Sequence, residues 1–273
     1  PIFPFSEYLS TEIEKDAYVS SYLRQPWFFL RIRNGYDEEV INCLEKHEIS
    51  FTRVSTNCIQ FTNQTRIDFL ADECAGLTEV QDLSSQLCGT YFNPVEESSW
   101  WDCCAGAGGK TLLLADIEPN VRIYASDYRE SVLENLRERI LRAGQRARKI
   151  FQTDLVHGVN LPVADLKFDG IILDAPCSGS GTWARTPEML ASFESSTIGR
   201  FSDMQFTIAC RVIDYLKSGA PLIYITCSVF TSENEELIDR LLDTGKLVLE
   251  KQEYFKGYGR GADTMFISKL IKV

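Results

Sequence analysis

The sequence predicts an α/β fold with a mainly parallel sheet, and two observations support this class. From residue 99 onward, short apolar segments that resemble strands alternate with stretches of helical periodicity. Three of these strands end at an aspartate, namely Asp127, Asp154 and Asp174. Alternating strands and helices form βαβ units, and ligands of open α/β sheets bind beyond the carboxyl ends of the strands. The edge that carries the three carboxylates is therefore the predicted binding edge.

The larger domain is expected to contain five core strands. In chain order they are Ser99–Cys104, Arg122–Asp127, Lys149–Asp154, Phe168–Asp174 and Pro221–Ser228. Apolar residues recur at helical spacing in Val132–Ala143 and in Met204–Leu216, which predicts helices that pack on the sheet. Two late apolar runs, Lys246–Lys251 and Thr264–Ile271, are expected to add a hairpin at one edge.

The first part of the chain has a different pattern. Trp27–Arg33 is strand-like, Asp37–His47 is helix-like, and Ser84–Tyr91 is again helix-like. Between them, Phe51–Val54 and Cys58–Phe61 are expected to form a short hairpin. We therefore predict two domains, a small α+β module at residues 1–90 and a larger domain at residues 91–273.

The composition excludes some classes of protein but not a nucleic-acid partner. With 273 residues, 44% hydrophobic and 11% aromatic, the chain has enough apolar material for a core, so disorder is excluded. The net charge is −11, which by itself argues against RNA or DNA. Residues 1–99 hold 7 Lys and Arg against 16 Asp and Glu, a net charge of −9. Residues 129–149 hold seven basic and three acidic residues, so the acidity does not decide the question.

The cysteines and the N-terminus bear on the compartment. The nine cysteines include no CxxC pair, and His47 and His157 have no metal-like spacing, so we predict no metal site. We expect the thiols to be reduced, and the sequence has neither an apolar run of about 20 residues nor a basic leader segment. Together these features predict a soluble cytoplasmic protein. The chain begins at Pro1 without an initiator Met, so we expect an N-terminal piece to be missing.

A glycine-rich loop, Asp102–Thr111, follows the first strand of the larger domain and begins a helix. A P-loop needs glycine at position 104, where this chain has Cys104, and the dinucleotide pattern G-x-G-x-x-G breaks at Thr111. A third interpretation is an S-adenosylmethionine site, in which the backbone approaches the ligand closely and Asp127 binds the ribose hydroxyls. A glycine-rich turn without a ligand remains the alternative.

Two cysteines follow neighbouring strands of the predicted sheet. Cys177 lies in Asp174–Thr182, and Cys227 lies in Thr226–Ser228. The C5 carbon of a pyrimidine becomes nucleophilic when a thiolate adds to C6, and a nearby acid stabilises the charge that develops. A base must then remove the C5 proton. Free thiols have a pKa of about 8.5, so a positive group such as Lys110 is needed to activate one of them.

These motifs resemble those of the RNA 5-methylcytosine methyltransferases, the Nop/Sun group. The matching segments are Cys104–Thr111, Asp174–Gly179 and Thr226–Ser228, and the pairing of Asp-Ala-Pro-Cys with Thr-Cys-Ser is highly specific. Weaker matches are Arg31–Asn34, Gln81 to Gln86 and Glu233–Glu236. The resemblance covers the chain from about Pro26 to the C-terminus.

The resemblance implies a Rossmann-like, seven-stranded methyltransferase domain behind a small RNA-recognition-like module. It implies S-adenosylmethionine as cofactor, structured RNA (rRNA or tRNA) as partner, no membrane or metal partner, and a monomer. Cys227 is implied as the nucleophile, Cys177 as the residue that aids product release, and Asp174 and Lys110 as catalytic neighbours of the base. The implied cofactor-binding residues are Cys104, Ala105, Gly106, Ala107, Gly108, Gly109, Lys110, Asp127, Asp154 and Asp174.

The loop departs from the family pattern Cys-Ala-Ala-Pro-Gly-Gly-Lys, because Gly106-Ala107-Gly108 replaces Ala-Pro-Gly. Proline fixes φ, so its loss predicts a looser loop and weaker cofactor binding. An RNA-binding scaffold without activity is therefore the alternative function. A methyltransferase acting on amino groups is disfavoured, since it needs Asn/Asp-Pro-Pro-aromatic where this chain has Asp174-Ala-Pro-Cys.

Overall fold

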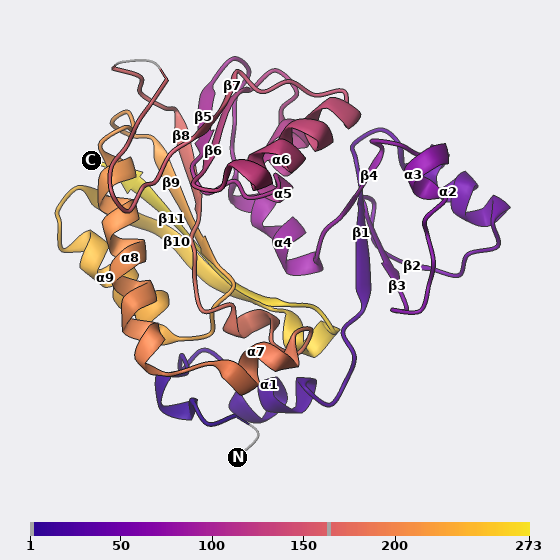
Figure 1. Cartoon of the computed structure of the whole chain (residues 1–273), viewed down its shortest axis with the longest axis horizontal. Coiled ribbons are helices and arrows are strands. Elements are labelled where there is room, and N and C mark those ends of the chain that lie inside the picture. The colour runs from indigo at the N-terminus through magenta and orange to yellow at the C-terminus, as the bar shows by residue number, and fades with distance from the viewer. Residues whose placement is uncertain (1–2, 163–164) are drawn as a thin grey trace.

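The computed structural model describes residues 3–162 and 165–273, which form two sheets. The seven-stranded sheet has the order β10-β11-β9-β8-β5-β6-β7, and the four-stranded sheet has the order β2-β3-β1-β4. Figure 1 shows the small sheet at one end of the molecule and the large sheet, with helices on both of its faces, at the other. The predicted α/β class with a seven-stranded Rossmann-like sheet is confirmed.

Five parallel strands form the centre and one edge of the large sheet. They are β5 (Ser99–Asp102), β6 (Arg122–Asp127), β7 (Lys149–Gln152), β8 (Gly170–Asp174) and β9 (Pro221–Thr226). The late apolar runs form the expected antiparallel hairpin, β10 (Leu247–Lys256) and β11 (Thr264–Lys272), which joins the sheet beside β9. β8 lies between β5 and β9, so their carboxyl ends meet at one edge.

Helices cover both faces of this sheet (Figure 1). α8 (Ser196–Ile213) and α9 (Glu235–Leu242) pack on one face, in a core shared with Leu173 and Tyr224. α5 (Gly109–Ile117) and α6 (Glu130–Arg142) pack on the other. α6 follows the predicted apolar periodicity, because Leu133, Leu136 and Ile140 are buried while polar residues face solvent.

The small sheet carries two helices on one side. Its strands are β1 (Phe28–Ile32), β2 (Thr52–Ser55), β3 (Cys58–Phe61) and β4 (Thr78–Val80), and its helices are α2 (Asp37–Lys46) and α3 (Leu70–Glu73). Leu30 and Ile32 of β1 pack with Val40 and Leu44 of α2 in a core separate from that of the large sheet. The hairpin expected at Phe51–Val54 and Cys58–Phe61 is present within one residue at each end.

Both ends of the predicted N-terminal module pack on the larger domain. Phe3 packs on Phe230 and Phe5 packs on Trp183. Tyr18 of α1 (Lys15–Ser21) packs on Phe3, and its hydroxyl donates to the carbonyl of Ser180 at 2.6 Å. At the other end, α4 (Leu83–Leu87) and the 3-10 turn η2 (Cys88–Tyr91) pack near α5. The division at residues 90 and 91 stays a prediction.

Several elements differ from the prediction for identifiable reasons. β7 ends at Gln152, so Asp154 lies two residues beyond its strand. The short elements β4, α1 and α7 (Pro187–Ser192) hold too few apolar residues for periodicity to indicate them. Within residues 3–162 and 165–273, no helix is both long and apolar enough to cross a membrane.

Candidate active site

The glycine-rich loop turns sharply between β5 and α5. Gly106 and Gly108 have φ angles of +52° and +94°, in the left-handed region that glycine adopts readily. A Cβ at Gly108 would lie 2.2 Å from Cδ1 of Leu136, which shows how closely the loop packs on α6. The Gly106 N–H donates to Oδ2 of Asp127 at 3.1 Å. The loop and the end of β6 are therefore directly linked.

Asp127 is almost fully enclosed by donors. Its Oδ1 accepts from the backbone N–H and the Nε of Arg129, both at 3.0 Å, and its Oδ2 accepts from Nη2 of Arg129 at 3.1 Å. Burial by itself raises the pKa of Asp127, but the Arg129 and Gly106 hydrogen bonds outweigh it and hold the pKa below its usual value. The carboxylate is therefore ionised at neutral pH.

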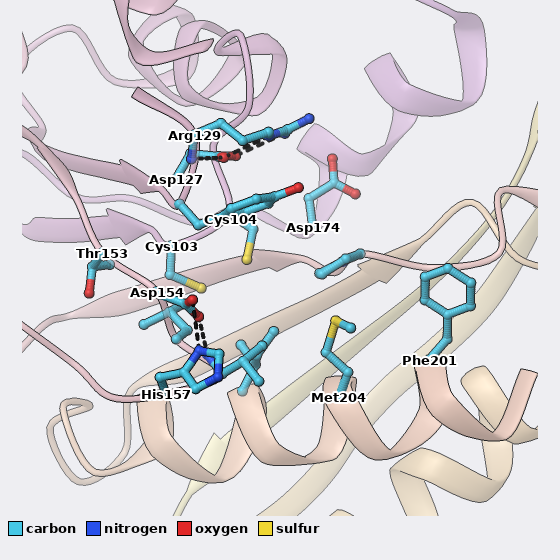
Figure 2. Close-up of a pocket in the computed structure, with 15 residues that line it drawn as sticks. Cys103, Cys104, Asp127, Arg129, Thr153, Asp154, His157, Asp174, Phe201 and Met204 are labelled. Atoms are coloured by element: carbon cyan, nitrogen blue, oxygen red, sulfur yellow. Dashed lines mark hydrogen bonds and ion pairs between the residues drawn. The ribbon is translucent and has the colours of Figure 1, made fainter. Parts of the chain in front are cut away.

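A cavity of about 480 Å³ opens beside this carboxylate (Figure 2). It lies between the ends of β5, β6 and β8 and the side of α8, and Figure 2 shows Met204 and Phe201 rising from that helix. Asp154 lines the cavity half-exposed, and its Oδ2 lies 2.8 Å from Nδ1 of His157. The lining residues are Cys103, Cys104, Asp127, Tyr128, Arg129, Thr153, Asp154, Leu155, Val156, His157, Asp174, Pro176, Phe201, Met204 and Ile208.

Lys110 and Asp174 form a charged pair at the same edge. Nζ of Lys110 donates to Oδ2 of Asp174 at 3.0 Å and to Oγ of Ser85 at 2.8 Å. The Lys110 side chain is 5% exposed, whereas that of Asp174 is 32% exposed and reaches the cavity. Burial lowers the pKa of Lys110, but Asp174 more than compensates, so the net shift is upward and the ammonium persists.

The two predicted cysteines are in contact. The Sγ atoms of Cys177 and Cys227 lie 3.3 Å apart. Asp174 of β8 stands opposite Ile225 of β9, so Cys227, two residues further on, is delivered to the edge that carries Asp174. The hydrogen bond to Cys227, followed by burial, raises the pKa of Cys177 well above that of an ordinary thiol. Cys177 is therefore protonated at neutral pH.

The structure thus brings many predicted residues together. Cys104, Asp127, Asp154 and Asp174 line the cavity, while Ala105, Gly106, Ala107, Gly108 and Gly109 shape the adjoining loop. Sequence reasoning missed Ser85, Arg129 and the α8 side chains Phe201, Met204 and Ile208. The α8 residues belong to no motif, and their apolar side chains at helical spacing are typical of residues that pack in the core.

One further group of possible metal-ligating side chains meets in the small module. Donor atoms of Cys43, His47 and Glu73 lie within 4.8 Å of one another. One Glu73 oxygen accepts from Nζ of Lys46 at 2.7 Å, and the other lies 2.6 Å from Nε2 of His47. Ion pairing on the surface is sufficient to explain why these side chains meet.

Comparison with known proteins identifies a family. Residues 89–270 match the family model described as 16S rRNA methyltransferase RsmB/F. Ribosomal RNA small subunit methyltransferase B of Proteus mirabilis is 28% identical over 257 residues, covering 82% of this chain and 60% of that protein. The same enzyme of Escherichia coli O6:K15:H31 is 32% identical over 206 residues, covering 72% of this chain and 47% of that protein. The chain thus spans between 47% and 60% of the length of these two relatives.

Solved structures share the fold. A methyltransferase homolog protein from Pyrococcus horikoshii has a TM-score of 0.78 at 21% identity, over 94% of this chain and 90% of that one. NSun6 from Pyrococcus horikoshii, crystallised with SFG, an S-adenosylmethionine analogue, has a TM-score of 0.79 at 19% identity. That match covers 98% of this chain and 100% of NSun6.

Proposed function

The chain belongs to the 16S rRNA methyltransferase RsmB/F family, and from this premise we propose that it transfers a methyl group from S-adenosylmethionine to C5 of a cytosine in structured RNA, ribosomal RNA first. The observation that carries this proposal is the contact between Cys177 and Cys227 at 3.3 Å, at the sheet edge that also holds Asp174. Methyl transfer to an amino group or a hydroxyl needs no thiol pair. Methylation of a pyrimidine carbon needs a nucleophile and a base.

The cavity beside Asp127 suits the cofactor. An ionised carboxylate at the end of β6 can accept hydrogen bonds from ribose hydroxyls, and the apolar side chains of Leu155, Met204 and Ile208 can cover an adenine ring. At Gly106, where a Cβ would meet nothing within 4 Å, the loop backbone is open to close approach by a ligand. The cofactor, when bound, supplies an electrophilic methyl group.

Arg129 has to move before ribose hydroxyls can bind to Asp127. Its guanidinium donates a hydrogen bond to each carboxylate oxygen of Asp127, and these oxygens also accept hydrogen bonds from two backbone N–H groups. A carboxylate offers about four lone-pair sites, so all are taken. We infer that the Arg129 side chain, which is 48% exposed, swings away when ribose hydroxyls bind. The backbone donors of Gly106 and Arg129 stay and continue to orient the carboxylate.

Cys227 and Cys177 divide the covalent chemistry. The Cys227 thiolate adds to C6 of cytosine and forms a C–S bond, which leaves C5 nucleophilic enough to take the methyl group. Asp174, held by Lys110, faces the cavity and can stabilise the base on its N3 side. Removal of the C5 proton then restores the double bond and expels the Cys227 thiolate, so the enzyme is regenerated.

The thiol contact gives Cys177 a way to become the base at the right stage. Before reaction, the hydrogen bond and charge of Cys227 raise the pKa of Cys177. Once Cys227 is bonded to carbon it no longer exerts either effect. The pKa of Cys177 then falls, although burial and the charge of Glu233 still raise it, so loss of its proton becomes easier at the stage when a base must take the C5 proton.

Methyl transfer into RNA tests this proposal. The chain, radiolabelled S-adenosylmethionine and 16S rRNA are incubated, and the RNA is digested to nucleosides. Label in 5-methylcytidine supports the proposal, whereas label in any other nucleoside contradicts the C5 assignment. If the folded chain labels no RNA and calorimetry detects no binding of S-adenosylmethionine, the scaffold alternative is favoured instead.

A further inference from the structure

Behind the two cysteines lies a buried carboxylate to which the chemistry above assigns no role. Glu233, the last residue of the 3-10 turn η4 (Thr231–Glu233), is 0% exposed. Its Oε2 accepts from the backbone N–H of Ser178 at 2.8 Å and from Nε2 of Gln205 at 3.0 Å. Its Oε1 accepts from Oγ of Ser228 at 2.7 Å. Only neutral groups donate to this carboxyl group. Its burial raises its pKa above the usual value for Glu, and the hydrogen bonds from Ser178, Ser228 and Gln205, which favour the carboxylate, oppose that rise.

The hydrogen bonds of Glu233 reach both cysteine loops. Ser178 directly follows Cys177, and Ser228 directly follows Cys227, so each carboxylate oxygen holds one loop. Oγ of Ser178 also donates to Oγ of Ser228 at 3.1 Å, which ties the loops to each other. Nε2 of Gln205 donates to the carbonyl of Pro176 at 3.0 Å and so supports the first loop from α8.

We propose that Glu233 is the positioning residue of the thiol pair: its carboxylate holds the Cys177 and Cys227 loops in contact and places a negative charge behind Cys177. The catalytic meaning of this inference rests on the proposed function. The connection between the loops rests only on the hydrogen bonds described above. Glu233 touches no reacting atom in this scheme and acts through the two loops that it joins.

The charge of Glu233 also acts on Cys177. The hydrogen bond to Cys227 and burial are the larger causes of the raised pKa of Cys177, and the charges of Cys227 and Glu233 add to them. Tyr224 of β9 is a further titratable group beside Cys177 and Glu233, and its hydroxyl donates to the backbone carbonyl of Glu233 at 2.6 Å. Burial raises the pKa of Tyr224 well above its usual value, so the phenol stays neutral and adds no charge. A neutral side chain at position 233 removes one of the negative charges and lowers the pKa of Cys177.

Thiol alkylation tests the charge without requiring any methyl transfer. The full chain and its Glu233→Gln variant are treated with iodoacetamide from pH 6 to 10, and modification of the Cys177 peptide is followed by mass spectrometry. The midpoint for Cys177 should move to lower pH in Glu233→Gln and stay in place in Glu236→Gln, a matched change at an exposed position. An unchanged midpoint in folded Glu233→Gln overturns the electrostatic part of the proposal.

A second variant separates the connection between the loops from the charge. Ser228→Ala removes the donor to Oε1 but keeps the Glu233 carboxylate, so it should leave a charge opposite Cys177 and still disturb the Cys227 loop. In both variants kcat for methyl transfer should fall about 10- to 100-fold, as expected for misplaced reacting groups, while KM for RNA and cofactor affinity stay near wild type. Rates are expressed per folded molecule, measured by circular dichroism.

The outcomes remain distinguishable from failure of the proposed function. Wild-type kcat in folded Glu233→Gln overturns the positioning role. If the parent chain transfers no methyl group but Glu233→Gln shifts the alkylation midpoint of Cys177, the proposed function fails and the electrostatic link stands.

Discussion

The Sγ atoms of Cys177 and Cys227 lie 3.3 Å apart, although 50 positions separate the two residues in the chain. The sheet explains the meeting, because β8 and β9 are parallel neighbours and each cysteine follows the carboxyl end of its strand. Gly181, which follows Cys177 in the same loop, donates its N–H to the carbonyl of Cys227 at 2.8 Å and locks the two loops together. The ladder between β8 and β9 and this backbone hydrogen bond between the loops therefore hold the two thiols in contact.

This contact leads to opposite predictions for the two alanine variants. If Cys227 is the nucleophile, Cys177→Ala still forms the C6 adduct and transfers the methyl group, but it cannot remove the C5 proton. It should therefore accumulate a covalent RNA–protein adduct, visible as a slow band in denaturing gels, whereas Cys227→Ala should form none. Cys210→Ala, which changes a cysteine on α8 outside the thiol pair, is the control. If the covalent adduct accumulated only in Cys227→Ala, Cys177 would be the nucleophile and Cys227 the residue that aids product release.

The sequence predicts more of the fold than of the site. The strands of the large sheet were predictable because apolar runs, several of them ending in aspartate, recur between periodic helices, and β6 matches its expected bounds. β3 of the small sheet also matches its expected bounds. The β10 strand was expected to end at Lys251 but continues to Lys256, because pairing with β11 carries it through Gln252 and Glu253, whose polar side chains interrupt the apolar pattern.

The sequence pattern does not show which side chains are partners, whether they lie close in the chain, as Arg129 does to Asp127, or far apart, as Ser85 does from Lys110. Ser85, which accepts from Lys110, and Arg129, which covers Asp127, take their roles from three-dimensional packing. Glu233 lay inside a recognised segment, yet only the structure shows that its two oxygens serve different loops. Motifs thus indicate which strand ends matter, whereas the surrounding hydrogen bonds depend on tertiary contacts.

Arg129→Ala should preserve or tighten cofactor binding. The variant removes the guanidinium that occupies the Asp127 oxygens, and it keeps the backbone donors of Gly106 and residue 129. If displacement of the guanidinium opposes ribose binding, the Kd for S-adenosylmethionine should fall, by up to about tenfold for the loss of one partly exposed ion pair. Calorimetry measures the Kd, and Asp127→Asn should weaken binding in the same assay. A large loss of affinity in Arg129→Ala would mean that the guanidinium itself contacts the cofactor.

Asp116→Asn should loosen the attachment of the small module. Asp116, on α5, pairs with Arg31 and Arg33 from β1 and the residue that follows it, and all three side chains are buried. Breaking a buried ion pair leaves uncompensated charge, so the free energy of unfolding should fall by about 3 kcal/mol. Asp203→Asn, which breaks the exposed pair with Arg240, should cost less than about 1 kcal/mol. Urea denaturation measures the free energy of unfolding of both variants. Equal losses would show that the buried ion pairs of Asp116 contribute no more to stability than the exposed pair of Asp203.

The buried carboxyl group of Asp102 should make the free energy of unfolding depend on pH in an unusual way. The residue ends β5 fully buried, and burial raises its pKa to about 7, although Thr111 donates to Oδ2 at 2.6 Å and opposes the shift. An unfolded Asp has a pKa of about 3.9. Between these values the unfolded chain releases a proton that the folded chain keeps, so this group destabilises the fold as pH rises from about 4 to about 7. Above that range its effect is constant.

Asp102→Asn removes this titration while keeping a side chain of similar size. Urea denaturation from pH 4.5 to 8.5 measures the free energy of unfolding of the variant and the parent. The variant's value minus the parent's should increase as pH rises to about 7 and stay constant above it. The slope of the difference cannot exceed about 1.4 kcal/mol per pH unit, the limit for one proton. Asp72→Asn, at an exposed position of α3, should show no such gain. Parallel curves for the parent and Asp102→Asn across the whole range would mean that Asp102 is already ionised in the folded chain, with its charge held by the Thr111 hydroxyl and the nearby Lys110 ammonium.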